Sequence, residues 1–137
     1  MIGLLIVAHE NLGESLIRCV THVLGSRQPG LESLNIGSHD TAFRLLPKAK
    51  KLVESLDEGQ GVLVLTDMYG ATPANLACKL AVAGKVEVVT GVSLPMLIRA
   101  LTYREKTLAI MVSKAVSGGR DGVLHVELSP LHATARS

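Results

Sequence analysis

Apolar residues fall along the chain in short continuous runs that alternate with longer stretches of helical spacing. The continuous runs are typical of strands buried on both faces and lie at residues 2–8, 61–66 and 86–90, with a weaker strand predicted at 31–36. Between them, apolar residues recur every three or four positions, which predicts helices at 12–24, 42–56, 73–82, 94–101 and 108–116.

The end of the chain has a different pattern. Gly118 and Gly119 are predicted to end the last helix, with a turn over 117–122. In residues 123–128 apolar positions alternate with more polar ones. Such alternation is typical of an edge or antiparallel strand with one face toward solvent. Residues 129–137 are predicted to be a loose tail.

Strands that alternate with helices at this spacing predict an α/β fold with a doubly wound, mostly parallel sheet. No internal repeat or linker divides the chain, so residues 1–128 are expected to form one domain. In such sheets ligands bind beyond the carboxyl ends of the strands. Functional residues are therefore expected just after the strands.

The composition narrows the classes of function. The 137 residues include one Phe, two Tyr and no Trp, and the formal net charge is +2. Such a chain offers neither a basic patch nor stacking side chains for nucleic acid. No apolar run is long enough to span a membrane, so a cytoplasmic protein is expected. Cys19 and Cys78 have no metal or redox spacing and are predicted to be buried, and the histidines are not clustered, so no metal site is expected.

Two polar residues directly follow predicted strands: His9 after the first and Asp67 after the third. If these strands are neighbours, as in flavodoxin-like sheets, both side chains open into one crevice. The pair suits nucleophilic catalysis by imidazole, in which one ring nitrogen attacks phosphorus while a carboxylate holds the other N–H. Taken singly, His9 could be a structural histidine and Asp67 a cap or turn residue.

Residues 67–75, Asp-Met-Tyr-Gly-Ala-Thr-Pro-Ala-Asn, predict a turn from strand into helix. Gly70 lets the backbone approach an anion, and Thr72 can donate its hydroxyl. Thr72 is also a candidate N-cap, with Pro73 at the first helical position. The free N–H groups of a helix start favour phosphate.

These residues resemble a known family. The pattern Asp-x-x-Gly-x-Thr-Pro-x-Asn at 67–75, His9 after the first strand, and Gly-Val-Ser-Leu-Pro-Met-Leu at 91–97 are similar to enzyme IIA of mannose-family sugar phosphotransferase systems. The resemblance covers about residues 1–128. It implies a flavodoxin-like fold and a phosphocarrier that takes a phosphoryl group from the protein HPr on His9, oriented by Asp67, and passes it to a IIB protein.

The resemblance also implies a phosphoryl-binding turn made by Gly70, Ala71 and Thr72. Thr72 stands where the family commonly has Ser or Thr, and Ala71 stands where some members have a second Gly. The family's site needs no metal or organic cofactor, so none is expected here.

Partners are implied in the same way. Tyr69, Pro95 and Met96 are candidates for a partner surface, although 91–97 can equally be a simple turn into a helix. Family dimers exchange their last strand, so a homodimer that exchanges 123–128 is expected. The IIB partner is expected to be a separate chain, and any membrane contact to be indirect, through a transporter.

Three other functions compete with this interpretation. The phosphoryl-donor subunit of dihydroxyacetone kinase shares the fold, but its usual Asp-Leu-Gly-Ser turn lacks the Thr-Pro-x-Asn continuation. A signalling receiver would accept phosphate on Asp67, but it needs magnesium held by an acidic pair, and only Glu10 follows the first strand. A flavin- or nucleotide-binding module would need a glycine-rich loop there. Transport and regulatory phosphorelay both stay open, as do the sugar and the ring nitrogen of His9.

Overall fold

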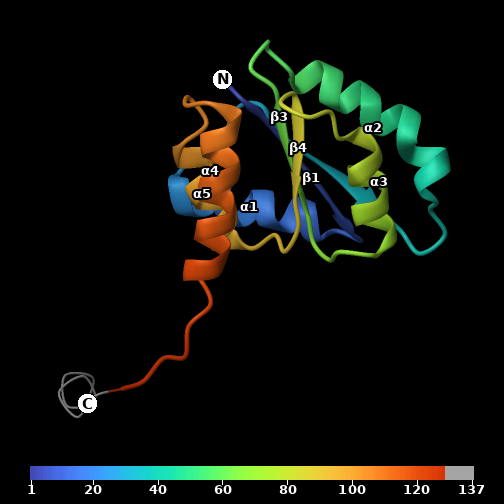
Figure 1. Cartoon of the computed structure of the whole chain (residues 1–137). Helices are drawn as coiled ribbons and strands as arrows, with labels where there is room; N and C mark the ends of the chain where they lie inside the picture. The colour runs from blue at the N-terminus through green and yellow to red at the C-terminus, as the bar shows by residue number, and fades with distance from the viewer. Residues whose placement is uncertain (129–137) are drawn as a thin grey trace.

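The computed structural model describes residues 1–128, and Figure 1 shows a central sheet between helices. Four strands and five helices follow one another in the order β1 (Gly3–His9), α1 (Leu12–Leu24), β2 (Leu31–Ile36), α2 (Ala42–Leu56), β3 (Val62–Thr66), α3 (Thr72–Leu80), β4 (Val86–Val89), α4 (Leu94–Thr102) and α5 (Leu108–Asp121). The predicted α/β alternation is confirmed.

The strands form one parallel sheet in the order β2-β1-β3-β4. Because β1 and β3 are neighbours, with Val7 opposite Thr66, the residues that follow them emerge side by side. We call the side of the sheet on which all four strands end the carboxyl edge. The doubly wound, flavodoxin-like prediction is therefore confirmed for these four strands.

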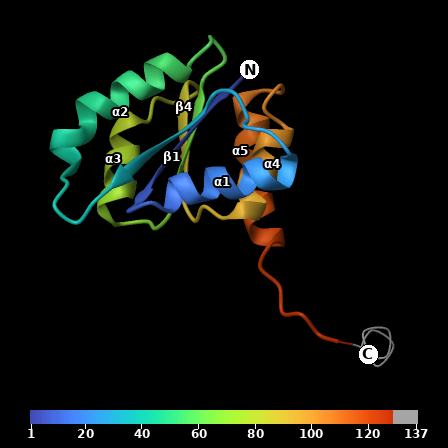
Figure 2. The same ribbon diagram turned by 180° about the vertical axis from the view of Figure 1, so that it is seen from behind.

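Helices cover both faces of the sheet. Helices α2 and α3 lie on one face, and α1, α4 and α5 lie on the other (Figures 1 and 2). The β1 side chains alternate between the two layers: Leu5 and Val7 pack with α2 and α3, whereas Leu4 and Ile6 pack with α1, α4 and α5. Burial of β1 on both faces explains its continuous apolar run.

Several element bounds agree with the sequence pattern. Helix α1 ends where Gly25 takes a left-handed conformation, φ 84°, which glycine adopts at little cost. Helix α2 begins after Thr41, whose side chain accepts a hydrogen bond from the N–H of Arg44. The predicted helices 12–24 and 42–56 and the strand 31–36 have the observed bounds.

The predicted break at Gly118 and Gly119 is wrong, because α5 continues to Asp121. A Cβ atom at position 118 would lie 2.9 Å from Cβ of Arg99, and one at Gly122 would lie 2.8 Å from Cβ of Pro95. These glycines let α5 pack closely against α4. Tertiary packing overrides their low helix propensity, and residues 117–122 are not the predicted turn.

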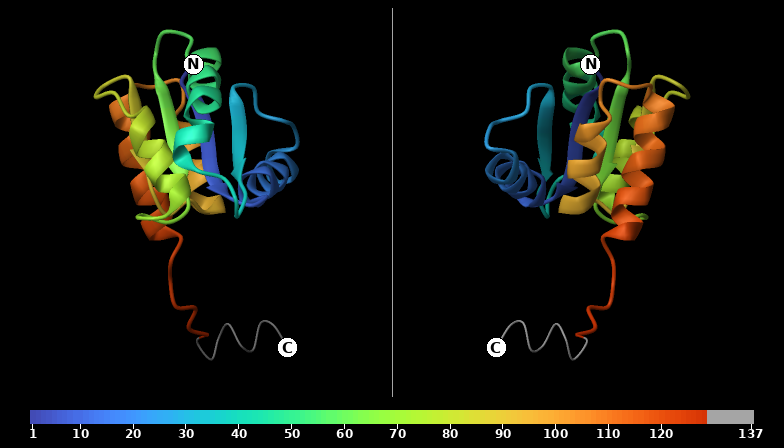
Figure 3. Two further views of the ribbon diagram at one scale, coloured as in Figure 1. Left: turned by 90° about the vertical axis from the view of Figure 1, so that its right-hand side faces the viewer. Right: turned by 90° about the vertical axis from the view of Figure 1, so that its left-hand side faces the viewer.

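The strand predicted at 123–128 is not formed in the single chain. Its residues have no regular secondary structure and are exposed, and the segment extends beyond the carboxyl edge from the end of α5 (Figure 3). Among the described residues, β4 is therefore the edge of the sheet, and a bridge between Val82 and Val86 is the only pairing on its outer side. The tail predicted at 129–137 lies outside the described residues.

Two further observations concern the helices. Cys19 on α1 and Cys78 on α3 are both exposed, so the prediction that they are buried is wrong. No helix within residues 1–128 has the length and apolar character to cross a membrane.

Candidate functional site

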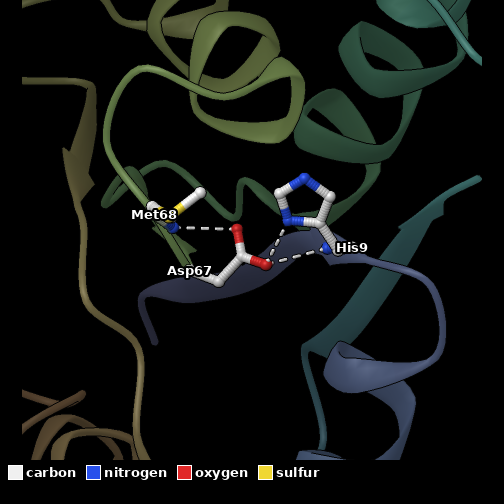
Figure 4. Close-up of polar contacts among 3 residues, drawn as sticks. All are labelled: His9, Asp67 and Met68. Carbon is white, nitrogen blue, oxygen red and sulfur yellow. Dashed lines mark hydrogen bonds and ion pairs between the residues drawn. The ribbon is translucent and has the colours of Figure 1, made fainter. Parts of the chain in front are cut away.

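His9 and Asp67 meet at the carboxyl edge, as predicted from their positions after β1 and β3 (Figure 4). The Nδ1 atom of His9 lies 2.7 Å from Oδ2 of Asp67, and the His9 backbone N–H donates to the same oxygen at 3.0 Å. The Met68 N–H donates to the other oxygen, Oδ1, at 2.9 Å. The carboxylate is thus fixed by three hydrogen bonds, two of them from backbone groups.

The environment of Asp67 favours its ionised form. Burial of the carboxyl acts to raise its pKa, but the hydrogen bonds from the His9 backbone, the His9 ring and the Met68 backbone outweigh burial, so that the net pKa of Asp67 is lowered. The Asp67 side chain is 13% exposed and the His9 side chain 46% exposed. A mostly buried carboxylate, which keeps some contact with solvent, therefore holds a ring that is much more exposed.

This arrangement determines the tautomer of a neutral His9. An ionised carboxylate can only accept hydrogen bonds, so Nδ1 carries the proton that points at Asp67. The lone pair of the neutral ring is then on Nε2, which lies on the far side of the ring from Asp67 (Figure 4). Within residues 1–128, Nε2 has no hydrogen-bond partner. It is the nitrogen available to an electrophile.

The turn from Asp67 into α3 leaves several donors free beside this site. Gly70 has a left-handed conformation with φ 88°. The N-cap of α3 is Ala71, which has no capping side chain, so the prediction that Thr72 is the N-cap is wrong. The Thr72 hydroxyl makes no hydrogen bond within residues 1–128.

The other helix starts offer a contrast. Thr41, Ser93 and Thr107 cap α2, α4 and α5 with side-chain hydrogen bonds. The starts of α1 and α3, which directly follow His9 and the Asp67 turn, have no side-chain cap. Their first N–H groups remain able to bind an anion at the carboxyl edge.

The three candidate residues for a partner surface differ in their exposure. Tyr69 is 81% exposed beside the site, and Pro95 is exposed at the start of α4. Met96 is only 4% exposed and packs in the core, so its assignment to a partner surface is wrong for the single chain. The Ser93 cap turns the chain so that Met96 points inward.

Some parts of the site were not predicted. The Met68 contact comes from a backbone N–H, which no residue type reveals. Glu10 has a left-handed conformation, φ 49°, and its N–H donates to the Ile36 carbonyl, which turns the chain sharply after His9. After β4, the Gly91 N–H donates to the Asp67 carbonyl at 3.1 Å. In the sequence, the only indication of these contacts is that the residues follow predicted strands.

The described residues around His9 and Asp67 do not form a cluster of metal ligands. No group of three or more His, Cys, Asp or Glu side chains in residues 1–128 could hold a metal ion. Both oxygens of Asp67 are already engaged by His9 and Met68. A receiver-type acceptor carboxylate would need oxygens open to a cation and to phosphorus.

The structure thus combines a parallel sheet covered by helices with a histidine that a carboxylate orients at the carboxyl edge. The family model EIIA-man, described as "PTS system fructose IIA component", where PTS is the phosphotransferase system, matches residues 3–116. The chain therefore belongs to this family of PTS IIA components.

Relatives and solved structures agree with this assignment. The chain is 30% identical over 137 residues to the PTS mannose-specific EIIAB component of Escherichia coli K12, covering 98% of the chain and 42% of that protein. A crystal structure of the PTS component EIIA from Streptococcus agalactiae is 25% identical, with a TM-score of 0.81 and coverage of 91% and 97% of the two chains. The mannose/sorbose IIA subunit from Enterococcus faecalis shares the fold, with 19% identity, a TM-score of 0.82 and coverage of 93% and 96%.

Proposed function

We propose that the protein is a phosphocarrier that accepts a phosphoryl group from phospho-HPr on Nε2 of His9 and passes it to a separate IIB protein. The observation that carries the proposal is the 2.7 Å contact between Nδ1 of His9 and Oδ2 of Asp67. It leaves Nε2 as the free nucleophile of a half-exposed ring. Membership of the PTS IIA family supports the same reaction.

In the proposed step, the Nε2 lone pair forms a bond to phosphorus while the bond from phosphorus to the donor's nitrogen breaks. The electron pair of the broken bond stays with the donor. The His9 ring keeps its proton on Nδ1 and becomes positively charged, and the Asp67 carboxylate stabilises that charge. Transfer to IIB is the same exchange in reverse, with a IIB side chain as the new nucleophile.

The oxygens of the phosphoryl group need hydrogen-bond donors that are not already bonded to other groups of the protein. The Thr72 hydroxyl and the uncapped start of α3, next to Gly70 and Ala71, meet this condition. The positive end of the α3 dipole adds to the attraction. These contacts require no metal or organic cofactor.

We also propose that the protein is a homodimer that exchanges residues 123–128. Within residues 1–128, no strand pairs with the outer side of β4, which has only the bridge to Val82. Two hollows of about 620 and 290 Å³ lie between β4 and α5. Glu87 and Val112 line the first, and Val89 and Val116 line the second. The apolar positions of 123–128 are exposed in the single chain, and pairing with a partner's β4 would bury them.

As a PTS component the protein would act in the cytoplasm and reach the membrane only through a transporter.

Mass spectrometry tests the phosphocarrier proposal. The protein is incubated with phosphoenolpyruvate, enzyme I and HPr, beside the variants His9→Ala and Asp67→Asn. The wild type should gain one acid-labile phosphoryl group, His9→Ala none, and Asp67→Asn should react about 100-fold more slowly because its ring charge is not balanced. Labelling of His9→Ala at the wild-type rate would refute the assignment of His9.

Nuclear magnetic resonance of the phosphorylated protein identifies the nitrogen. Phosphorus coupling to the ring protons differs between Nδ1- and Nε2-phosphohistidine. We expect the Nε2 isomer, and observation of the Nδ1 isomer would contradict the role given to Asp67.

A further inference from the structure

We propose that Glu10 is a positioning residue of the phosphoryl site, and that its left-handed backbone conformation fixes the direction of the His9 ring. The proposal rests on the proposed phosphocarrier function and adds a residue that holds the nucleophile from the side of β2, while Asp67 holds it from the side of β3.

The conformation of Glu10 is unusual for its residue type. Its φ is 49°, and within residues 1–128 every other residue with a positive φ is a glycine. In this conformation the Cβ atom lies too close to a carbonyl oxygen, a cost that glycine avoids. Such strain persists only where surrounding contacts enforce it, and strained residues cluster at functional sites. Glu10 directly follows the candidate nucleophile.

Hydrogen bonds to both neighbouring strands hold the chain just before the turn. The His9 N–H donates to Oδ2 of Asp67, which follows β3, at 3.0 Å. The Glu10 N–H donates to the carbonyl of Ile36, the last residue of β2, at 2.9 Å. Ile36 is also the register partner of His9. The end of β1 is therefore fixed on both sides.

Close packing fixes the chain just after the turn. Helix α1 begins only two residues after Glu10, and Figure 4 shows the ribbon turning after His9 toward this helix. Gly13 in its first turn is buried, and a Cβ atom there would lie 3.1 Å from Cγ2 of Ile6 and 3.1 Å from Cβ of Ser33. The start of α1 therefore lies directly against β1 and β2. A connection this short, fixed at both ends, enforces the left-handed turn.

The consequence falls on the His9 ring. A residue at position 10 that cannot keep a positive φ must rotate the peptide group that joins it to His9, because the packing of Gly13 prevents α1 from moving away. The bond from the N–H of residue 10 to Ile36 is then lost, and the His9 ring shifts relative to Asp67. A nucleophile displaced by about 1 Å can lose about 100-fold in rate. We therefore assign the turn to the alignment of Nε2.

The test varies the conformational preference of residue 10. Phosphoramidate, a small phosphoryl donor, and phospho-HPr are both used as donors. Glu10→Val introduces a β-branched residue, which resists a positive φ. Glu10→Gln is its reference, because it removes the charge without changing the branching. Glu10→Asn and Glu10→Gly introduce residues that accept the left-handed conformation.

Gly25→Val is the matched control. Gly25 is the C-cap of the same helix, at the opposite edge of the sheet, with φ 84° and no atom within 4 Å of a Cβ at that position. The substitution therefore imposes the same kind of backbone strain on α1, away from His9. Far-ultraviolet circular dichroism and thermal unfolding report the fold and the stability of each variant.

We expect Glu10→Val to accept the phosphoryl group about 10-fold or more slowly than Glu10→Gln. Glu10→Asn and Glu10→Gly should keep the rate of Glu10→Gln. Gly25→Val should lower the midpoint of thermal unfolding, as Glu10→Val does, but keep the wild-type rate. Nitrogen-15 magnetic resonance gives a readout that does not depend on the donor. The neutral His9 ring should carry its proton on Nδ1 in Glu10→Gln and should be a mixture of tautomers in Glu10→Val.

Equal rates and equal tautomers in Glu10→Val and Glu10→Gln would overturn the role of Glu10. Equal slowing by Gly25→Val would also overturn it, because the loss would then follow general stability. If Glu10→Val does not fold, Glu10→Thr, which is also β-branched, takes its place in the comparison. Failure of the phosphocarrier proposal gives a different result, a wild type that neither phosphoramidate nor phospho-HPr labels.

Discussion

Asp67 Oδ2 accepts hydrogen bonds from both the ring Nδ1 and the backbone N–H of His9, at 2.7 and 3.0 Å. One oxygen thus fixes both the end of β1 and the orientation of the ring that follows it. The ring cannot turn about its Cβ–Cγ bond without losing the shorter of the two contacts. The same carboxylate therefore contributes to folding stability and to the direction in which Nε2 points.

The first prediction concerns the pH dependence of stability. The folded-state pKa of Asp67 is lowered, because the hydrogen bonds from His9 and Met68 outweigh burial. A lowered folded pKa means that the stabilisation is present above the unfolded value of about 3.9 and is lost as the pH falls through the folded value. We expect Asp67→Asn to lower the free energy of unfolding by about 1–2 kcal/mol at pH 7.

Urea unfolding at a series of pH values measures this difference between wild type and Asp67→Asn. The difference should shrink below about pH 4. A difference that grows as the pH falls would show that Asp67 is not stabilised as the carboxylate.

The second prediction concerns the contact between α4 and α5. Gly118→Ala would bring a Cβ atom to 2.9 Å from Cβ of Arg99 and 3.2 Å from the Pro95 carbonyl oxygen. Neither atom can move without shifting α4, so the free energy of unfolding should fall by about 1–3 kcal/mol.

Gly119→Ala is the matched control in the same helix. Its Cβ atom would meet only the flexible end of Met96, Cε at 2.8 Å, and Cβ at 3.8 Å. Because alanine is the better helix former, this variant should be neutral or slightly more stable in thermal unfolding. Equal losses in the two variants would mean that the glycines do not mark a close helix contact.

The third prediction concerns a buried hydroxyl under the site. Thr66 is fully buried at the end of β3, and its Oγ1 has no hydrogen-bond partner in the part of the chain that the structure describes. Thr66→Val replaces the hydroxyl with a methyl group of similar size, so it should raise the free energy of unfolding by about 1 kcal/mol. Thr66→Ser keeps the hydroxyl and loses the methyl group, so it should lower that energy by a similar amount. A loss of stability in Thr66→Val would indicate that the hydroxyl has a partner in solution.

Much of the fold could be predicted because most strands and helices have a characteristic pattern of residues within their own sequence. Continuous apolar runs identify strands buried on both faces, and the end of α1 at Gly25 and the Thr41 cap of α2 are encoded within one turn of the helix. The meeting of His9 with Asp67 followed from one topological rule, that neighbouring parallel strands end at the same edge.

Three errors have separate physical causes, which the local pattern of residue types does not reveal. Gly118 and Gly119 look like a helix end until α4 is seen against them. Met96 looks like part of an exposed loop until the Ser93 cap turns it into the core. The Thr72 hydroxyl looks like a cap, although the helix starts at Thr72 itself, one residue earlier than that role requires.

The last prediction concerns the segment 123–128. Its apolar and polar residues alternate as in a strand, but the segment forms no strand in the single chain. Leu124, Val126 and Leu128 are 68%, 65% and 52% exposed and lie on one side of a strand if the segment becomes extended. Pairing with β4 of a second copy would place these side chains over the hollows beside α5, whereas His125 would stay on the wetter side. The double variant Leu124→Asp/Val126→Asp should therefore be monomeric in light scattering at a concentration where the wild type is a dimer. His125→Asp adds a charge at the same place on the other face and should leave the dimer intact. If both variants dimerise like the wild type, the association uses another surface. If the wild type is itself a monomer, strand exchange is excluded, and β4 must keep its outer edge open.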